Sequence, residues 1–275
     1  MPFLDIPRRE KAPAFFAPKG GAVALLPSIA LSYTMCMVPK TVGEQATANL
    51  QQRLAENPYV GRGIVIGRTA EGTWMQVYWI SGRSANSRNR IFVAEGDVLR
   101  TEAADPAKLS NPKLIIYNAM RVYARRSIVS NGVHTDAIHE GFAAGRSFAE
   151  SLAGWLHEPD PPNYTPRIAG YVDLEADEAW LAILKASPFD PEHSERHFFR
   201  FDCVEPGYGY AITTYDSDGE PLPAFSGVPY LLPLADVPTR FWEALNPEHR
   251  ISLAVRRIAA DGAVETEIIN RYEAV

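Results

Sequence analysis

Arginines alternate with hydroxyl and amide side chains in the segment SGRSANSRNR, residues 81–90. A planar guanidinium can donate paired hydrogen bonds to phosphate oxygens, and serine and asparagine side chains add further donors. The segment lacks the glycine pattern of a nucleoside-triphosphate loop. It therefore predicts a loop that binds an anion, with a solvated polar loop as the alternative. The candidate donors are Arg83, Ser84, Asn86, Arg88 and Arg90.

Two polar residues, Tyr117 and Asn118, interrupt a predicted strand from Leu114 to Val122. A buried hydroxyl or amide costs free energy unless it has a hydrogen-bond partner, so these side chains are expected to be satisfied or used. Tyr117 could donate to a carbonyl oxygen or an oxyanion, and Asn118 could bind an amide edge. His134 follows in the string VSNGVHTD, where it is either catalytic or a structural residue at a helix start.

Prolines hold the segment DPPNYTPRI, residues 160–168, which brings Asp160 and Arg167 close together in sequence. Prolines lower the entropy lost when such a loop is ordered. The segment is either a site loop or a rigid connection. A further string, YVGRGIVIGR from residue 59, places Gly61 and Gly63 around a strand, where they serve a turn, tight packing or a close backbone approach. Its arginines, Arg62 and Arg68, are interpreted as solvated strand ends.

The elements that position these residues follow from hydrophobic periodicity and turn signals. Runs of strands, interrupted by one or two clear helices, favour an α+β fold over alternating α/β. The expected helices are Val42 to Glu56, about Thr135 to Trp155, and Val237 to Leu245. The expected strands are Gly63–Arg68, Thr73–Ser81, Arg90–Glu95, Leu114–Val122, Ser127–Val129, Arg167–Asp173, Ala179–Lys185, Arg196–Val204 and Gly209–Thr214. A loop over Glu220–Pro229 and a mixed element over Ile251–Ile258 complete the assignment.

Composition limits the partners of the chain. Its 275 residues, 46% of them hydrophobic, can bury the core of one large domain, predicted over residues 41–275. The net charge of −6 argues against a nucleic-acid partner but permits a small phosphorylated ligand at a local cluster of arginines. Residues 1–40 are predicted to be a dispensable extension, either poorly ordered or the result of a start codon assigned too early; their apolar run is too short to span a membrane. Two cysteines, Cys36 and Cys203, favour a reducing cytoplasm.

No cofactor is expected. The histidines are scattered, and no carboxylate cluster stands at ligand spacing in the sequence, so no metal site is predicted. Homo-oligomer formation is left open.

Taken together, the motifs resemble the archaeal-type IMP cyclohydrolase family and its bacterial relatives. The resemblance covers about residues 57 to 230, and its strings are specific in combination and order. The matching pieces are Tyr59–Arg68, Ser81–Arg90, Tyr117–Asp136 with its YN and VSNGxHTD strings, Thr165–Ile168, and the region around Thr213–Tyr215 with Pro223–Gly227.

The resemblance implies a four-layered αββα sandwich like that of the N-terminal-nucleophile hydrolases, without their self-processing nucleophile. It implies a hydrolase of purine nucleotide biosynthesis that acts on a cyclic amidine C–N bond. The family closes 5-formamido-1-(5-phosphoribosyl)imidazole-4-carboxamide to inosine monophosphate and water, without metal or organic cofactor. Carried over by motif, Tyr117 is the catalytic polar residue with Asn118 beside it, Arg83 and either Arg88 or Arg90 contact the phosphate or ligand, and Arg167 lies nearby.

Two departures from the family pattern affect the acid and base. Archaeal members read roughly Ser-Arg-Ser-Phe-Pro-Asn-Arg where this chain has SANSRNR from Ser84, so the matched arginine is either Arg88 or Arg90. Members also carry acidic residues just before the Thr-Pro-Arg string, where Asp160 is the near candidate here. Asp160 is therefore assigned to collect the amide proton, and Tyr117 to donate to the formyl oxygen.

A purine-nucleotide-binding or sensing protein of the same fold, without turnover, is the main alternative. An amide hydrolase on a similar layered fold is the second, but the sequence shows no nucleophile positioned for it.

Overall fold

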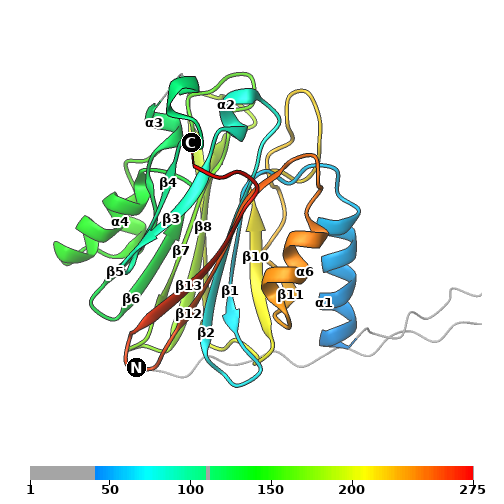
Figure 1. Ribbon diagram of the computed structural model, residues 1–275. Coiled ribbons are helices and arrows are strands. Elements are labelled where there is room, and N and C mark those ends of the chain that lie inside the picture. Colours follow the sequence, from blue (N-terminus) through cyan, green and yellow to red (C-terminus); the bar gives the residue numbers. More distant parts are fainter. Residues whose placement is uncertain (1–40, 110–111, 275) are drawn as a thin grey trace, which may run out of the picture. The chain divides into compact units, whose positions relative to one another are not determined.

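Two antiparallel β-sheets form the centre of the computed structural model, which describes residues 41–109 and 112–274 (Figure 1). These residues belong to one compact unit, Lys40–Val275. The expectation of an α+β fold is confirmed, because the elements are mostly strands with a few short helices. No described helix is long and apolar enough to cross a membrane. The prediction of an extension over residues 1–40 falls outside the described residues.

The first sheet has six strands in the order β11-β10-β1-β2-β12-β13. Its centre is the hairpin of β1 and β2, in which Gly63 pairs with Trp79 and Arg68 with Trp74. The strand bounds are β1 Gly63–Arg68, β2 Trp74–Ser81, β10 Tyr208–Thr213, β11 Tyr230–Pro233, β12 Arg250–Ile258 and β13 Val264–Asn270.

The second sheet has seven strands in chain order, from β3 to β9. Each strand pairs antiparallel with the next, so this sheet is a meander. The bounds are β3 Ile91–Glu95, β4 Val98–Glu102, β5 Asn118–Tyr123, β6 Arg126–Ser130, β7 Arg167–Asp173, β8 Glu178–Ala186 and β9 Ser194–Phe201.

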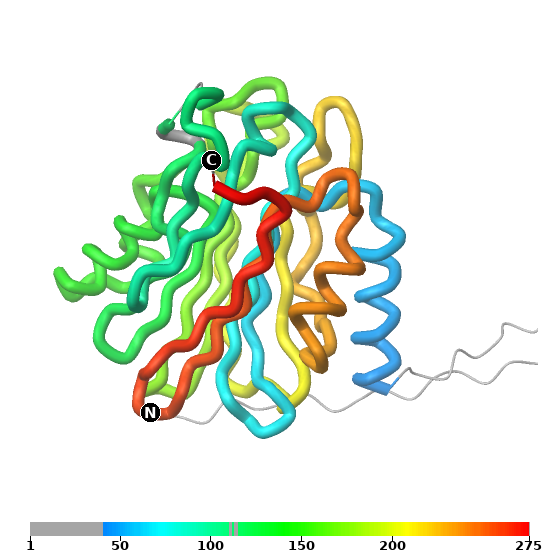
Figure 2. Tube along the Cα trace, in the orientation of Figure 1, coloured from blue at the N-terminus to red at the C-terminus, as the bar shows by residue number. Residues whose placement is uncertain are grey.

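Helices lie on the outer face of each sheet (Figures 1 and 2). Beside the first sheet, α1 packs on β11 and α6 on β12. Beside the second, α4 packs on β5 and β6, and an apolar cluster with Ile138, Phe142 and Phe148 joins α4 and α5 to the sheet. The bounds are α1 Val42–Leu50, continued by a π-helical turn over Gln51–Ala55, then α2 Ala85–Arg88, a 3₁₀ turn over Pro106–Lys108, α3 Pro112–Ile115, α4 His134–Ala143, α5 Phe148–Leu152 and α6 Val237–Ala244.

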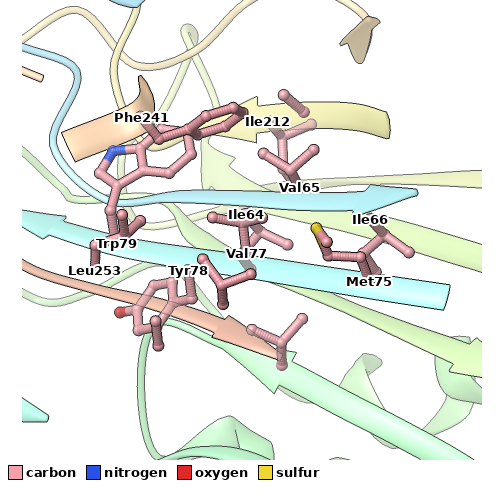
Figure 3. Close-up of a cluster of buried hydrophobic side chains, with 14 of the residues drawn as sticks. Ile64, Val65, Ile66, Met75, Val77, Tyr78, Trp79, Ile212, Phe241 and Leu253 are labelled. Atoms are coloured by element: carbon pink, nitrogen blue, oxygen red, sulfur yellow. The ribbon is translucent and has the colours of Figure 1, made fainter. Parts of the chain in front are cut away.

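The main core includes the facing sides of the sheets and the layer beneath α6. Successive residues of β2 point to opposite faces, as expected for a strand. Trp79 points toward Phe241 of α6, with ring centroids 6.3 Å apart, whereas Tyr78 points to the other side of the strand (Figure 3). Both β2 side chains are fully buried.

Polar side chains join the two sheets at their edge and centre. The Phe92 N–H of β3 donates to Asn270 Oδ1 at the end of β13, and Asn270 Nδ2 donates to the Phe92 carbonyl, each over 2.9 Å. Between the sheets, Gln76 of β2 and Ser127 of β6 exchange two hydrogen bonds of 2.8 Å. These directional bonds fix how the strands of one sheet lie over those of the other.

The observed elements correct several predictions. The predicted strand from Leu114 is wrong in its first half, where α3 runs Pro112–Ile115 and the strand begins at Asn118. The single helix from Thr135 to Trp155 is two helices, α4 and α5. The mixed element is strand β12, and β4, β11, β13 and α2 were not predicted. The prediction of Arg167–Asp173 as a strand is confirmed residue for residue.

Candidate active site

A cavity of about 260 Å³ opens near the starts of β1 and β7 and the ends of β2 and β10. α2, drawn at the top of Figure 1, lies at this end of the sheets. Four segments far apart in sequence contribute its walls. They supply Tyr59, Gly61, Arg62, Ser81, Arg83, Ser84, Asn86, Ser87, Arg90, Glu158, Asp160, Asn163, Thr165, Thr214, Tyr215 and Leu222.

Arg62 is held by its own backbone. Gly61 before it has a φ of +67°, and a Cβ at Gly61 would lie 2.2 Å from Thr214 Oγ1, so no other residue fits this turn without strain. The Arg62 N–H donates to Thr214 Oγ1 over 3.1 Å, and the Thr214 N–H donates to the Arg62 carbonyl over 2.9 Å. The turn therefore directs a largely buried arginine into the cavity, where a solvated strand end had been expected.

Glu158 is the buried counter-ion of this region. Its Oε1 lies 3.3 Å from Arg62 Nη1 and 3.9 Å from Arg167 Nη1, and its side chain is only 6% exposed. Burial disfavours the charged form of Arg62, but Glu158 offsets this, and the pKa of Arg62 is raised. Glu158 is thus an acid beside Arg167 in addition to Asp160, the candidate from the sequence, which also interacts electrostatically with Arg167.

Arg90 is a buried cation with unused donors. Its Nε and Nη1 have no hydrogen-bond partner among the described residues, although the residue is only 3% exposed. Asn89 fixes the adjoining backbone, since its side chain exchanges two hydrogen bonds with the backbone of Asp105. Burial and the charge of Arg62 lower the pKa of Arg90. A buried guanidinium in this state favours an anionic or carbonyl ligand.

Most of the polar side chains from Arg83 to Arg88 line the cavity, and Arg88 does not. Ser84 caps α2 by accepting from the Ser87 N–H over 3.1 Å, and both serines line the cavity with Asn86. Arg83 also lines it and donates to Asp218. Arg88 does not: its Nε donates to the Gly82 carbonyl, and its Nη2 lies 3.3 Å from His249 Nδ1. Of the two arginines left open by the motif, Arg90 is the one at the cavity.

Asp160 lines the cavity and also organises its own loop. Its carboxylate accepts from the Thr165 N–H over 2.7 Å and from the Thr165 hydroxyl over 2.5 Å. Because Thr165 donates there, the Tyr215 hydroxyl, 2.6 Å from the same oxygen, donates to it. Burial raises the pKa of Asp160 despite these bonds.

Tyr117 is not among the residues that line the cavity. It is buried, and its hydroxyl lies 2.7 Å from that of Tyr78. Both hydroxyls interact electrostatically with Arg62 and Arg90, which do line the cavity. The tyrosine pair therefore adjoins the cavity arginines from the core side.

Three other predicted residues lie away from the cavity lining. Asn118 donates to Asp136 of α4 over 2.9 Å, on the opposite side of β5 from the core position of Tyr117. His134 is fully buried, with Nε2 3.1 Å from the Ile168 carbonyl, which fits the structural interpretation. Arg167 stacks on Trp155 and donates to the Leu156 carbonyl, and it interacts electrostatically with Glu158, Arg62 and Asp160, which line the cavity.

Sequence patterns did not indicate several cavity residues. Glu158 stands in a loop beside Pro159 and carries no periodic signal, and Leu222 comes from the loop predicted over Glu220–Pro229. Tyr215 stands in a string that matched the family, but no role was assigned to it. The acidic residue expected before the Thr-Pro-Arg string was the available signal for Glu158, which precedes the assigned Asp160 by two residues. Within residues 41–109 and 112–274, no group of three or more His, Cys, Asp or Glu side chains could hold a metal ion.

Comparisons with known proteins agree with the motifs. A model of the family described as IMP cyclohydrolase-like protein matches residues 59–262, which include every lining residue of the cavity. Proteins named IMP cyclohydrolase are similar to this chain in Haloquadratum walsbyi (36% identity over 118 residues, 42% of this chain and 56% of that protein) and Methanocaldococcus jannaschii (35% over 117 residues, 42% and 57%). These matches span little more than half of those relatives.

A third relative is covered more fully. The protein named IMP cyclohydrolase in Methanopyrus kandleri is 30% identical over 166 residues, which are 59% of this chain and 77% of that protein. The chain belongs to the IMP cyclohydrolase-like protein family.

Proposed function

We propose that this protein is an IMP cyclohydrolase, closing 5-formamido-1-(5-phosphoribosyl)imidazole-4-carboxamide to inosine monophosphate and water. The observation that carries the proposal is the pairing of Arg62 with Glu158 beside Arg90, whose buried Nε and Nη1 have no hydrogen-bond partner among the described residues. All three line a cavity made by residues of the matched family region. Cations, a carboxylate and nearby hydroxyls are the groups that proton transfer and oxyanion stabilisation require.

The exposure of the arginines suggests how the nucleotide lies. The Arg83 side chain is 30% exposed, against 12% for Arg62, and Arg90 is almost fully buried. Arg83, with Ser84, would hold the phosphate toward solvent, while the imidazole and its substituents reach Arg62 and Arg90. The deeper end then excludes water, which strengthens each electrostatic contact with the reacting groups.

Ring closure forms one C–N bond and breaks one C–O bond. The carboxamide nitrogen attacks the formyl carbon and loses a proton, and the formyl oxygen gains one to give a hydroxyl. This hydroxyl then leaves with a second proton as water, and a C=N bond forms. Gripping the phosphate would hold the two groups together, so that remote binding energy serves the chemical step.

Glu158 suits the role of the proton acceptor. It is buried beside Arg62 and Arg167, and it lines the cavity. Asp160 is the alternative acceptor, but both of its oxygens already accept hydrogen bonds from Thr165. Arg90 would stabilise the developing negative charge on the formyl oxygen, with Tyr117 as the proton donor.

Further parts of the proposal concern the whole chain. The order of helices, sheet, sheet and helices supports an αββα sandwich resembling the N-terminal-nucleophile hydrolases, with residues 41–275 as its single domain. A purine-pathway nucleotide in the cytoplasm is the proposed ligand, and association into homo-oligomers is left to measurement.

The decisive experiment is an assay of the purified protein with the formamido nucleotide, following formation of inosine monophosphate. We expect turnover by the natural sequence, and a loss of about 100-fold or more in Glu158→Gln, the range of general acid–base catalysis. Asp160→Asn serves as the matched control and should lose less.

Circular dichroism and binding of inosine monophosphate would verify that both variants fold, because Glu158→Gln leaves two buried arginines without their counter-ion. A protein that binds inosine monophosphate but forms none would contradict the proposed function. Full turnover by Glu158→Gln would instead remove Glu158 as the proton acceptor.

A further inference from the structure

The three arginines that line the cavity differ in what neutralises them. Arg62 is paired with the buried Glu158, whereas Arg90 has no acidic partner within hydrogen-bond distance in the described part of the chain. Arg83 is paired with Asp218, whose Oδ1 lies 2.5 Å from Arg83 Nη1, and the same nitrogen lies 3.3 Å from the Gly219 carbonyl. The Asp218 carboxylate is therefore paired with Arg83, the cavity arginine that faces solvent.

Asp218 stands on an exposed turn between two anchored points. On one side, the Asp216 N–H donates to the Pro223 carbonyl, and Asp216 accepts from Ser226. On the other, the Leu222 N–H donates to Asn163 Oδ1 in the cavity wall. The Asp218 side chain is 41% exposed. It can leave Arg83 for water without detaching the rest of the loop.

A phosphate group competes well for the same guanidinium. A phosphate monoester carries about −1.5 to −2 charges at pH 7, whereas a carboxylate carries one. It also presents three acceptor oxygens, which suit the donor fork of arginine. The Arg83 guanidinium itself lies 5.2 Å from the centre of the Tyr59 ring, which keeps it at the cavity wall when its partner changes.

We propose that Asp218 is an internal substitute for the nucleotide phosphate: it holds Arg83 in the empty site, is displaced by the phosphate of the ligand, and promotes product release by competing for Arg83. This inference rests on the proposed function, since it takes Arg83 as the phosphate contact. Asp218 is therefore a specificity-determining residue, which lowers the affinity for phosphorylated ligands and leaves that for unphosphorylated nucleosides unchanged.

The test is binding of inosine monophosphate and of inosine to Asp218→Asn, measured by titration calorimetry. The asparagine keeps the size of the side chain and removes its charge. We expect inosine monophosphate to bind about two- to fivefold tighter, as for loss of a partly exposed ion pair, with a larger gain at low salt. Inosine should bind as it does to the natural sequence. Stopped-flow displacement should show slower release of inosine monophosphate.

Two variants serve as controls. Asp177→Asn removes a carboxylate that pairs with Arg68 and does not line the cavity, and it should leave binding unchanged. In an Arg83→Ala background, Asp218→Asn should give no gain in affinity for inosine monophosphate, because the guanidinium for which the carboxylate and the phosphate compete is absent. A gain that persists without Arg83 would mean a general charge effect and would overturn the inference.

Equal or weaker binding of inosine monophosphate by Asp218→Asn would also overturn it, as would a parallel change for inosine, which indicates a merely structural loop residue. The proposed function fails separately. Tighter binding by Asp218→Asn without turnover by the natural sequence supports the inference and contradicts the enzyme. Turnover by the natural sequence without tighter binding by Asp218→Asn supports the enzyme and contradicts the inference about Asp218. Failure of the natural sequence to bind inosine monophosphate contradicts both proposals.

Discussion

At the scale of single residues, the hydroxyls of Tyr78 and Tyr117 share one hydrogen bond, so only one of them donates to the other. Tyr78 is fully buried, and burial raises its pKa well above the ordinary value, so its hydroxyl keeps its proton. If Tyr78 donates to Tyr117, the proton of Tyr117 is not used in this hydrogen bond and can be donated toward the cavity wall at Arg62 and Arg90, which Tyr117 adjoins. Tyr78 is then a positioning residue, and Tyr117 is the proton donor of the proposed reaction.

Tyr117→Phe should reduce turnover by about 100-fold or more with little change in KM, as for the loss of one oxyanion donor. Tyr78→Phe should reduce it less, because Tyr117 keeps its own proton and loses only its orientation. Steady-state kinetics of the two variants, with inosine monophosphate binding as the check of folding, measures the difference. Equal turnover by Tyr117→Phe and the natural sequence would exclude Tyr117 from the reaction.

Residue types with chemical capacity could be predicted from the sequence, but their pairing could not. The arginines of residues 81–90 were identified as an anion site because their spacing is dense, and Arg83 and Arg90 do line the cavity. The ion pair of Arg62 and Glu158 joins positions 96 residues apart, and neither residue has a local pattern that indicates the other. Such a contact depends on how the two sheets are stacked, which periodicity does not report.

At the scale of elements, helix α4 begins at His134, whose side chain joins the helix to β7 through the Ile168 carbonyl. Burial, with the nearby charge of Arg167, lowers the pKa of His134 from 6.5 to about 3. Nδ1 has no partner among the described residues. The folded protein therefore holds His134 neutral, with Nε2–H donating to the carbonyl.

A lowered pKa in the folded state means that the unfolded chain binds the extra proton first, between pH 6.5 and about 3. The contribution of His134 to stability is complete above pH 6.5 and is lost as the pH falls. We expect the free energy of unfolding to drop by up to about 1.4 kcal/mol per pH unit below pH 6. His134→Gln, which can still donate to the carbonyl, should show a shallower slope.

Urea denaturation of both proteins at several pH values from 7 to about 4.5 measures this slope. Asp160, whose pKa is raised by burial, contributes a slope of the opposite sign, but it is the same in both proteins and cancels in the comparison. Identical slopes for the two proteins would show that His134 does not carry the acid sensitivity.

Elements with regular patterns were predicted with nearly correct bounds, whereas short or edge elements were missed. β1 and β7 are buried along nearly their whole length, so continuous apolar runs indicated them. Residues Val264–Asn270 of β13 alternate charged and partly buried positions at the edge of a sheet, and the pattern is too polar to stand out. α2 consists of four residues and is stabilised by the Ser84 cap, a contact without periodicity.

At the scale of the whole molecule, the space between the two sheets encloses a charge as well as the apolar core. Arg256 of β12 is completely buried, pairs in register with Gln76, and donates from Nε to Thr266 Oγ1 over 3.0 Å. Its Nη1 and Nη2 have no partner in the described part of the chain. Burial lowers its pKa to about 10 and the carboxylate of Asp97 offsets this only in part, so the guanidinium is still charged at pH 7.

Arg256→Met should raise the free energy of unfolding at pH 7 by about 1–4 kcal/mol, because an apolar side chain of similar length removes the desolvation cost of the charge. The neighbouring Arg257→Met is the matched control. Arg257 lies 3.7 Å from Glu267, and both side chains are at least 40% exposed, so its replacement should change stability by no more than about 0.5 kcal/mol. Urea denaturation measures both values. Destabilisation by Arg256→Met would mean that the guanidinium is satisfied in the folded protein and helps to hold the two sheets in register.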